Sequence, residues 1–156
     1  MNIDDAAQEL KKAFGASIID VHKRSDRRLY LMVDKNSIVP VAGYVFRNMD
    51  ARFMISTGTD TPRGVIEVNH HFAFDKDNFV VTLRTLVDRN NPEIDSISSV
   101  VPAANWIERE MWELLGVRFI GHPDMRHLVL ADDWPAGKYP LRRDYTGIDD
   151  AWPRKQ

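Results

Sequence analysis

The chain has 156 residues, of which 44% are hydrophobic and 28% charged, a composition typical of one folded domain that excludes an intrinsically disordered protein. Its formal net charge of -2 gives no electrostatic reason to expect nucleic acid or an anionic membrane as the main ligand. Because cysteine is absent, disulfides, thiolate zinc sites, cysteine nucleophiles and cysteine-ligated iron–sulfur clusters are excluded.

The first elements in chain order are a predicted helix and a hairpin. Residues 2–14 place apolar side chains on one face, with acidic residues in the first turn and lysines in the last, and Gly15 supplies the end of the helix. Residues 17–23 and 29–33 alternate apolar and polar side chains on either side of the polar turn 24–27. This pattern predicts two antiparallel strands.

A second helix is predicted to begin at Asn36 or Ser37, capped by either side chain, with Pro40 tolerated in its first turn. Its inward face would carry Ile38, Val41, Val45, Phe46 and Met49. The uncharged stretch 38–46 is only about half of the roughly 20 residues that a membrane-spanning helix needs. Since residues 1–5 do not resemble a secretory signal, we expect a cytoplasmic protein that contacts a membrane only through another subunit.

The middle of the chain predicts a sheet. Three segments rich in β-branched and aromatic residues are separated by turn-forming residues, at 52–57, 64–74 and 78–87. They indicate an antiparallel meander, which a short strand at 97–101 and a helix at 103–115 would follow. The order of elements predicts an α+β fold: a largely antiparallel sheet with helices packed on one face.

The last third of the chain is typical of an extended arm. After Gly116, which closes the third helix, both periodicities are lost, and glycine and proline recur. All four tryptophans lie in the last third, and aromatic residues are enriched at protein interfaces. We therefore predict an α+β domain at 1–116 and an extended partner-docking arm at 117–156. The tryptophans and the prolines of this third are Trp106, Trp112, Trp134, Trp152, Pro123, Pro135, Pro140 and Pro153.

One carboxylate in the third helix stands out. On a helical wheel, Glu108 falls among apolar residues, where a carboxylate is costly unless it is paired. Two interpretations remain open. Either Glu108 is a buried anchor held by Arg126, Arg142 or a partner, or it reaches out to solvent at the helix margin.

The opposite face of the same helix carries an acid and a base. Arg109 and Glu113 are spaced i,i+4, a spacing that brings side chains together on a helix surface. We expect an ordinary exposed ion pair, worth only about 0.3 kcal/mol.

Histidines offer a weak metal signal. His122, Asp124 and His127 lie within six residues, but the segment is broken by a proline, and zinc or iron sites normally draw ligands from separate elements. The alternative is that His122 and Asp124 cap and hydrogen-bond a tight turn. His70 and His71 cannot share an ion, because neighbours on a strand point to opposite faces. No nucleophile elbow and no phosphate-binding loop is present.

Residues 106–130 carry a long motif that resembles the signature of the C-subunit, or thirty-kilodalton subunit, family of complex I. Residues 140–145 resemble the closing Pro-Leu-Arg-Lys-Asp-aromatic element of the same family. Position 113 is Glu where the family more often has Asp. The residues at matching spacing are Glu108-Arg109-Glu110, Glu113, Gly116 and Gly121-His122-Pro123-Asp124-x-Arg126.

The tail bears on the kind of complex. Residues 132–142 read Asp-Asp-Trp-Pro-x-Gly-x-Tyr-Pro-Leu-Arg, which resembles the version in energy-converting membrane-bound NiFe hydrogenases and related complexes. The form typical of NADH:quinone oxidoreductases is Gly-Phe-Glu-Gly-x-Pro-Leu. The resemblance favours the hydrogenase branch, with the C-subunit of a respiratory NADH:quinone or related donor oxidoreductase as the alternative. Hypotheses from other classes are a stand-alone metal-binding protein using His122 and His127, and a generic interaction module.

The resemblance implies a scaffold that holds no cofactor and performs no chemical step. Iron–sulfur clusters, and a nickel–iron site in the hydrogenase branch, would belong to partner subunits. The chain is expected on the cytoplasmic side of the membrane as a peripheral subunit that packs on the catalytic large subunit and a neighbouring iron–sulfur subunit. The implied partner-binding residues are Glu108, Arg109, Glu110, Trp112, His122, Asp124, Arg126, Trp134, Tyr139, Leu141, Arg142, Asp144 and Tyr145.

Overall fold

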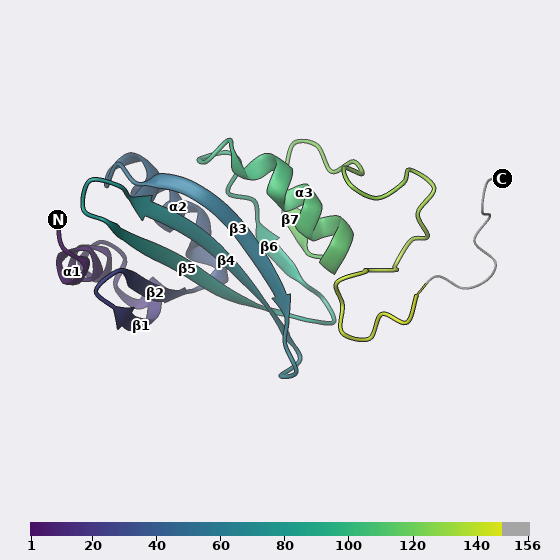
Figure 1. Cartoon of the computed structure of the whole chain (residues 1–156), viewed down its shortest axis with the longest axis horizontal. Coiled ribbons are helices and arrows are strands. Elements are labelled where there is room, and N and C mark those ends of the chain that lie inside the picture. The colour runs from purple at the N-terminus through teal and green to yellow at the C-terminus, as the bar shows by residue number, and fades with distance from the viewer. Residues whose placement is uncertain (148–156) are drawn as a thin grey trace.

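The computed structural model describes residues 1–147, which form a curved sheet, three α-helices and an extended C-terminal segment (Figure 1). The predicted arm is therefore described up to residue 147, and Trp152 and Pro153 lie outside the described residues. The elements in chain order are α1 (Ile3–Phe14), η1 (Gly15–Ser17), β1 (Ile18–Ser25), β2 (Arg28–Val33), η2 (Lys35–Ser37), α2 (Ile38–Arg47), β3 (Arg52–Asp60), β4 (Val65–Phe74), β5 (Phe79–Asp88), β6 (Glu93–Asp95), α3 (Ala104–Leu115) and β7 (Arg118–Ile120).

Five strands form the main sheet, in the order β1-β2-β5-β4-β3. Neighbouring strands are antiparallel except β2 and β5, which run parallel. β6 and β7 form a separate two-stranded parallel pair. The predicted hairpin, the predicted meander and the α+β class with a largely antiparallel sheet are thus confirmed. The parallel pairing of β2 with β5 is not predicted by any local sequence pattern, because the two strands are far apart in the chain.

Helix α1 begins at a capping box. The Asn2 side chain accepts hydrogen bonds from the amides of Asp4 and Asp5, both at 2.9 Å, and the Asp5 carboxylate accepts one from the Asn2 amide. These bonds satisfy N–H groups that the first helical turn leaves without a partner. Gly15, with φ of +50°, ends the helix as predicted. The residues of α1 that are buried in the core are Ile3, Ala6 and Leu10.

Helix α2 begins at Ile38, directly after the 3-10 turn η2. The predicted capping by the side chain of Asn36 or Ser37 is wrong. Instead, Asp34 caps η2 by accepting a hydrogen bond from the Asn36 amide at 2.9 Å, and the Ser37 side chain makes no capping bond. The extra 3-10 turn moves the capping position towards the N-terminus. The predicted inward face of α2 is confirmed for four of its five residues, because Ile38, Val41, Val45 and Met49 are buried. The fifth, Phe46, is half-buried.

The three α-helices share one face of the sheet. Their buried side chains form a single hydrophobic cluster with the inward side chains of the strands. Figure 1 shows α3 along the β3 edge, and Gly58 of β3 permits this close approach. A Cβ atom at Gly58 would lie 2.4 Å from the Leu115 Cδ1 atom of α3. The prediction of helices packed on one face is therefore confirmed, and α3 is held firmly beside β3.

The predicted strand at 97–101 is wrong. The short strand lies earlier, at Glu93–Asp95, and pairs with β7 beyond α3. Residues 97–101 form a tight turn, in which the Ile97 carbonyl accepts hydrogen bonds from the amides of Val100 at 3.0 Å and Val101 at 2.8 Å. Ile97 and Val101 are both fully buried, and their i,i+4 spacing is that of one helical turn rather than of a strand.

The two central histidines lie on opposite faces of the sheet. The His70 ring is fully buried on the core side, with Nδ1 at 2.7 Å from the Ser56 hydroxyl. The His71 ring lies on the other face, with its nitrogens 3.2 Å from Thr57 Oγ1 and 2.9 Å from Thr82 Oγ1. This arrangement confirms that the pair cannot share one ion.

The predicted domain boundary at residue 116 falls between α3 and β7. Because β7 pairs with β6, residues 118–120 remain attached to the domain before the irregular segment begins. The division into 1–116 and 117–156 stays a prediction. Within the described range, 1–147, no helix has the length and apolar character needed to cross a membrane.

Replacing Gly58 by alanine tests the contact between α3 and β3. The added methyl group would overlap Leu115, which is buried, so we expect the free energy of unfolding to fall by about 1–3 kcal/mol. Urea unfolding followed by tryptophan fluorescence measures this loss. Gly43→Ala is the matched control. Gly43 lies inside α2, and its added methyl group would contact Val100 at 3.4 Å without overlap, so the free energy of unfolding should stay the same or rise. Equal losses in both variants would contradict the close contact.

Candidate partner interface

The first attachment of the arm is a buried acid and base on α3, which we call the Glu113 site. The Arg109 guanidinium donates hydrogen bonds to the carbonyls of Arg126 at 2.9 Å and His127 at 2.7 Å. The Glu113 carboxylate accepts from three consecutive arm amides, those of Leu128, Val129 and Leu130. Arg109 is 8% exposed and Glu113 3% exposed. The prediction of an ordinary exposed ion pair is therefore wrong.

A physical reason explains the burial of these two charges. Residues 126–130 form no helix or strand, so their backbone groups have no partners within the segment. The guanidinium supplies donors to the carbonyls, and the carboxylate supplies acceptors to the amides. Each charge is thereby desolvated against several backbone dipoles, which offsets part of the cost of burying it. Helical periodicity could not reveal the burial of Arg109 and Glu113. A helical wheel assigns both residues to the solvent face of α3, and the arm covers that face in the folded chain.

Glu108 is a buried anchor, as one of the two interpretations held, but its partners are not Arg126 or Arg142. The carboxylate accepts hydrogen bonds from the Ser96 hydroxyl at 2.5 Å and the Ile97 amide at 2.8 Å, and is 0% exposed. It therefore fixes the turn after β6 against α3. Burial raises the pKa of Glu108 to about 7, and the two hydrogen bonds oppose that rise.

His122 and Asp124 hydrogen-bond a tight turn, as the sequence indicated. The buried His122 ring donates through Nε2 to the Asn105 carbonyl at 2.9 Å and accepts at Nδ1 from the Asp124 amide at 3.0 Å. Two such bonds define the neutral tautomer. Asp124 also forms a bidentate ion pair with Arg126. Among residues 1–147, no group of three or more His, Cys, Asp or Glu side chains is placed to hold a metal ion.

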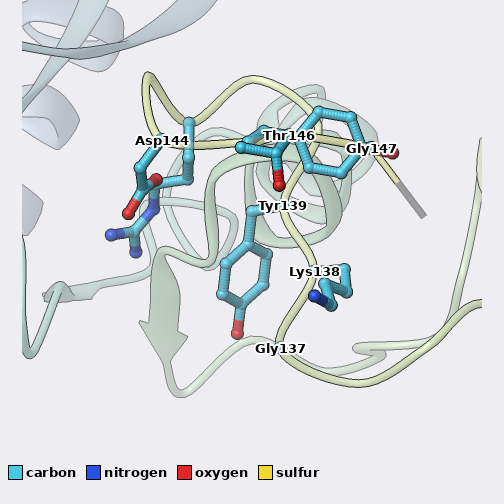
Figure 2. Close-up of a pocket in the computed structure, with 8 residues that line it drawn as sticks. Gly137, Lys138, Tyr139, Asp144, Thr146 and Gly147 are labelled. Carbon is cyan, nitrogen blue, oxygen red and sulfur yellow. The ribbon is translucent and has the colours of Figure 1, made fainter. Parts of the chain in front are cut away.

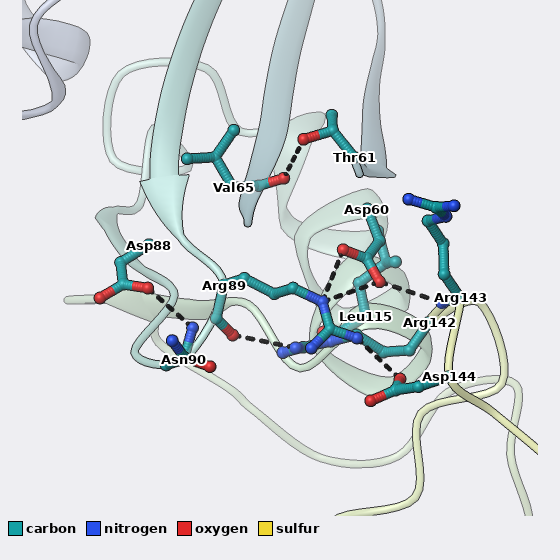
Figure 3. A network of polar contacts seen from close by, with 10 residues as sticks. All are labelled: Asp60, Thr61, Val65, Asp88, Arg89, Asn90, Leu115, Arg142, Arg143 and Asp144. Atoms are coloured by element: carbon teal, nitrogen blue, oxygen red, sulfur yellow. Dashed lines mark hydrogen bonds and ion pairs between the residues drawn. The ribbon is translucent and has the colours of Figure 1, made fainter. Parts of the chain in front are cut away.

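The second attachment, which we call the Arg142 site, fixes the arm to the ends of β3, β5 and α3 (Figure 3). The Arg142 guanidinium donates to the carbonyls of Leu115 at 2.5 Å and Arg89 at 2.9 Å. The Arg89 guanidinium in turn binds the carboxylates of Asp60 and Asp144, each at 2.8 Å. The arm thus donates charge-assisted hydrogen bonds to the domain, and the domain donates them to the arm.

Asp60 is the acid at the centre of this second site. Its side chain is fully buried at the end of β3, and it also accepts a hydrogen bond from the Arg143 amide at 2.9 Å. Burial disfavours the charged form, but the hydrogen bonds from Arg89 and from the Arg143 amide outweigh burial, so the pKa of Asp60 lies below its ordinary value. Asp60 therefore stays ionised at neutral pH and keeps the arm bound.

Between the two sites, Tyr139 packs directly on the end of α3. Gly116 adopts φ of +75°, and a Cβ atom there would lie 2.6 Å from the Tyr139 ring. The Leu141 amide donates to the Leu114 carbonyl at 2.9 Å, which satisfies one carbonyl of the last helical turn. Gly116 thus ends the helix, as the sequence predicted, and its lack of a side chain lets the Tyr139 ring pack against it.

A shallow polar pocket of about 310 Å³ opens where the arm folds back on itself (Figure 2). It brings together four of the implied partner-binding residues, and the Arg142 guanidinium lies 5.2 Å from the centre of the Tyr139 ring. A second pocket of about 190 Å³ lies between α3 and the arm and is lined by Trp112, Trp134 and Tyr139. The implied residues that line the first pocket are Tyr139, Arg142, Asp144 and Tyr145.

The implied partner-binding residues fall into three groups. Glu108, Arg109, His122 and Arg142 are engaged within the chain by the bonds described above. Arg109 and Arg142 hold the arm, His122 fixes its own turn against α3, and Glu108 fixes the turn after β6. Others are exposed at the surface: Leu141 is 57% exposed, and the Arg126 side chain is 78% exposed. The remainder are half-buried or more exposed: Glu110, Trp112, Asp124, Trp134, Tyr139, Asp144 and Tyr145.

Sequence reasoning missed three residues that fix the arm. Glu113 carried a signal, since it belongs to the motif, but its i,i+4 partner Arg109 suggested a surface pair. Asp60 is the last residue of β3 and Arg89 directly follows β5, and nothing local to them points to the arm. Their partners Arg143 and Arg142 lie more than fifty residues further along the chain.

The chain is similar to known proteins over most of its length. The family described as respiratory-chain NADH dehydrogenase, 30 Kd subunit, matches residues 31–151. The chain is 35% identical over 149 residues to the C-subunit of the F(420)H(2) dehydrogenase of Methanosarcina mazei, covering 94% of both chains. It is 31% identical to the hydrogenase-4 component G of Escherichia coli K12, covering 86% of this chain and 25% of that protein.

A solved structure shares the fold. A chain of the membrane-bound sulfane sulfur reductase, an archaeal respiratory membrane complex, superposes with a TM-score of 0.79 at 22% identity, over 91% of this chain and 84% of that chain. The chain therefore belongs to the family of the 30 kDa subunit of respiratory-chain NADH dehydrogenase. It is accordingly a subunit of a redox complex, and the resemblance carried by residues 106–145 is confirmed.

Replacing Glu113 by glutamine tests the first attachment. The amide keeps one acceptor but loses the charge that binds three backbone N–H groups, so we expect the local opening free energy of the arm to fall by about 2 kcal/mol. Amide hydrogen exchange at residues 128–130 should become roughly 30-fold faster. Glu110→Gln, on the same helix but outside the Glu113 site, should leave this exchange unchanged. Unaltered protection in Glu113→Gln would show that the carboxylate does not hold the arm.

Replacing Glu108 by glutamine tests the buried carboxylate through pH. Since folding raises the pKa of Glu108 from 4.5 to about 7, its contribution to stability is full below pH 4.5 and is lost as the pH rises to about 7. We expect the stability of Glu108→Gln relative to wild type to improve by about 3 kcal/mol across that window. Urea unfolding from pH 4.5 to 8 measures it.

The difference between the two proteins is the relevant quantity, because another group acts in the opposite sense. Burial lowers the pKa of His70 to about 3, so His70 contributes stability that increases as the pH rises towards 6.5. That contribution is common to both proteins and cancels. A stability difference that does not change with pH would disprove the raised pKa of Glu108.

Proposed function

We propose that this chain is a non-catalytic scaffold subunit in the peripheral part of a membrane-bound redox complex, and that it packs on the catalytic large subunit through its C-terminal arm. The two attachment sites support this proposal, because they hold the arm to its own domain through buried charges. Large apolar side chains of the last third nevertheless remain exposed. Those more than half exposed are Trp106 at 67%, Val129 at 61% and Leu141 at 57%.

That exposure is the observation that carries the proposal. A segment held in place without a regular element presents its side chains in a fixed arrangement, which lowers the entropy lost on binding. Large apolar side chains held in this way are available for burial by a protein partner, and Trp is among the residue types enriched at interface hot spots. A partner would bury them while the Glu113 and Arg142 sites stay intact, so docking needs no rearrangement of the charged residues.

The cofactors of the complex would lie in other subunits. The chain contains no cysteine with which to ligate an iron–sulfur cluster. We propose that clusters reside in a neighbouring iron–sulfur subunit and that any nickel–iron site belongs to the large subunit. The chain would then lie on the cytoplasmic side as a peripheral subunit, and would contact the membrane through its partners.

For the kind of complex, we propose an energy-converting NiFe hydrogenase. The tail sequence at 132–142 supports this branch, as does the similarity to a hydrogenase-4 component. The second candidate is a donor:quinone oxidoreductase of the NADH or F420H2 type. A specific observation favours it: the C-subunit of the F(420)H(2) dehydrogenase matches at 35% identity over 94% of both chains, whereas this chain spans only 25% of the hydrogenase component.

Purification decides between the two. The tagged chain, isolated from its native membranes in mild detergent, should bring down a large subunit and an iron–sulfur subunit identified by mass spectrometry. Nickel in the purified complex would support the hydrogenase branch. Nickel-free partners with NADH or F420H2 oxidation activity would assign the donor:quinone branch instead. A chain recovered alone would overturn the scaffold proposal.

Replacing Arg126 by alanine separates assembly from folding. Its side chain is 78% exposed and, among residues 1–147, pairs only with Asp124, so the isolated chain should keep its thermal midpoint. If Arg126 contacts a partner, recovery of the complex should fall several-fold. Arg63→Ala is the matched control, since Arg63 is 68% exposed and forms a comparable surface pair with Glu67. Full recovery and activity of the complex with Arg126→Ala would count against a role for this residue in docking.

A further inference from the structure

A second surface lies at the opposite end of the sheet from the arm. Here the β1–β2 turn, the start of β3 and the β4–β5 turn border a groove of about 270 Å³. Figure 1 shows these strand ends beside the N-terminal helix, while the described part of the arm lies beyond α3. None of the residues that line the groove belongs to the Glu113 or Arg142 sites.

Strand register defines the shape of this groove. Arg52 of β3 lies opposite Ala73 of β4, Ala73 opposite Val80 of β5, and Val80 opposite Arg28 of β2. The four residues therefore form one row across the sheet, with two small apolar side chains between two arginines. The arginine Cα atoms are three strand spacings apart, about 14 Å, which leaves room for one extended segment between them.

The charges around the groove are not balanced. Arg52 forms a bidentate ion pair with Asp75, at 2.7 and 2.8 Å. Arg27 and Arg28 are exposed, and in the described part of the chain neither guanidinium takes part in an ion pair or a hydrogen bond. Two positive charges thus remain uncompensated beside an apolar floor.

The neighbouring histidine reports the same positive field. Burial lowers the pKa of His71, and the charges of Arg28 and Arg84 lower it further. His71 lies on this face of the sheet, in the second row from that of Arg28 and Arg52. The field therefore extends from the groove across the open face, and it favours an anionic occupant.

We propose that this groove binds an acidic segment of another subunit, whose carboxylates pair with Arg27 and Arg28 and whose chain lies on Ala73 and Val80. The guanidinium fork matches a carboxylate in a bidentate fashion. The apolar floor, together with Met54 at 44% exposure, favours a polypeptide over a small inorganic anion, which would leave that surface uncovered. The inference rests on the proposed function in that the occupant is another subunit, but it uses residues separate from the arm.

The chain would then contact partners at two ends. The arm presents apolar side chains near α3, and the groove presents arginines at the far end of the same sheet. Because one sheet and one core connect the two surfaces, the chain would fix the distance between two subunits.

Cross-linking in the native complex tests the groove. The chain has no cysteine, so Met54→Cys places a unique thiol in the groove and Leu141→Cys places one on the arm. Each variant, tagged and assembled in its native membranes, carries a thiol-linked photo-cross-linker. Mass spectrometry identifies the joined peptides. We expect the Met54→Cys variant to form adducts with a segment of another subunit that contains several Asp or Glu residues.

Charge variants make the test specific. Arg27→Glu with Arg28→Glu should reduce the groove adduct of Met54→Cys at least ten-fold, whereas Arg27→Lys with Arg28→Lys should retain much of it. Arg24→Glu with Arg63→Glu reverses two exposed arginines outside the groove and should leave the adduct unchanged. Raising the salt concentration should weaken the adduct, as expected for exposed charge pairs.

The two thiol positions separate the two proposals. Adducts from Leu141→Cys with none from Met54→Cys would overturn the groove and leave the scaffold function standing. Adducts from neither position would overturn both. A groove adduct with a neutral or basic segment, or with lipid alone, would also overturn the acidic-segment proposal. So would an adduct that survives charge reversal, because the arginines would then not select the partner.

Discussion

The structure depends on satisfying the backbone of an irregular segment with charges from a helix. Residues 126–130 have no helix or strand partners of their own, and Arg109 and Glu113 supply donors and acceptors in their place. If either charge were absent, the buried backbone groups that it binds would lose their partners, a cost of about 1–3 kcal/mol for each group. This constraint explains why an acid and a base remain buried on the outer face of α3.

The same principle links the other parts of the C-terminal third. Arg142 binds the carbonyl at the end of α3, and Asp60 binds the Arg143 amide of the arm. Charged side chains thus again hydrogen-bond backbone groups that have no partner within a helix or strand. Glu108 does likewise for the turn after β6. Three loops are thus fixed around one helix. The charged residues of the family motif therefore have a structural role within the chain, apart from any contact with a partner.

This division of roles suits a scaffold. Buried charges hold the arm, and under the proposed function the exposed apolar side chains and the basic groove would recognise other subunits. Charged residues that are already desolvated within the chain need not be desolvated again on assembly, which reduces the cost of binding. The surfaces at the two ends of the sheet differ in chemistry, one apolar and one basic, so each of the two proposed partners would fit only one of them.

The sequence by itself determined the α+β class, the end of α1 at Gly15, the meander and the end of α3 at Gly116, because hydrophobic periodicity and turn residues are local. It also indicated that Glu108 is an exception on an apolar face. Only the tertiary structure decided what Glu108, Arg109 and Glu113 bind, because their partners belong to irregular segments that local pattern cannot place. The parallel pairing of β2 with β5, and the row of Arg28 and Arg52 across the sheet, likewise follow from contacts between residues distant in the chain.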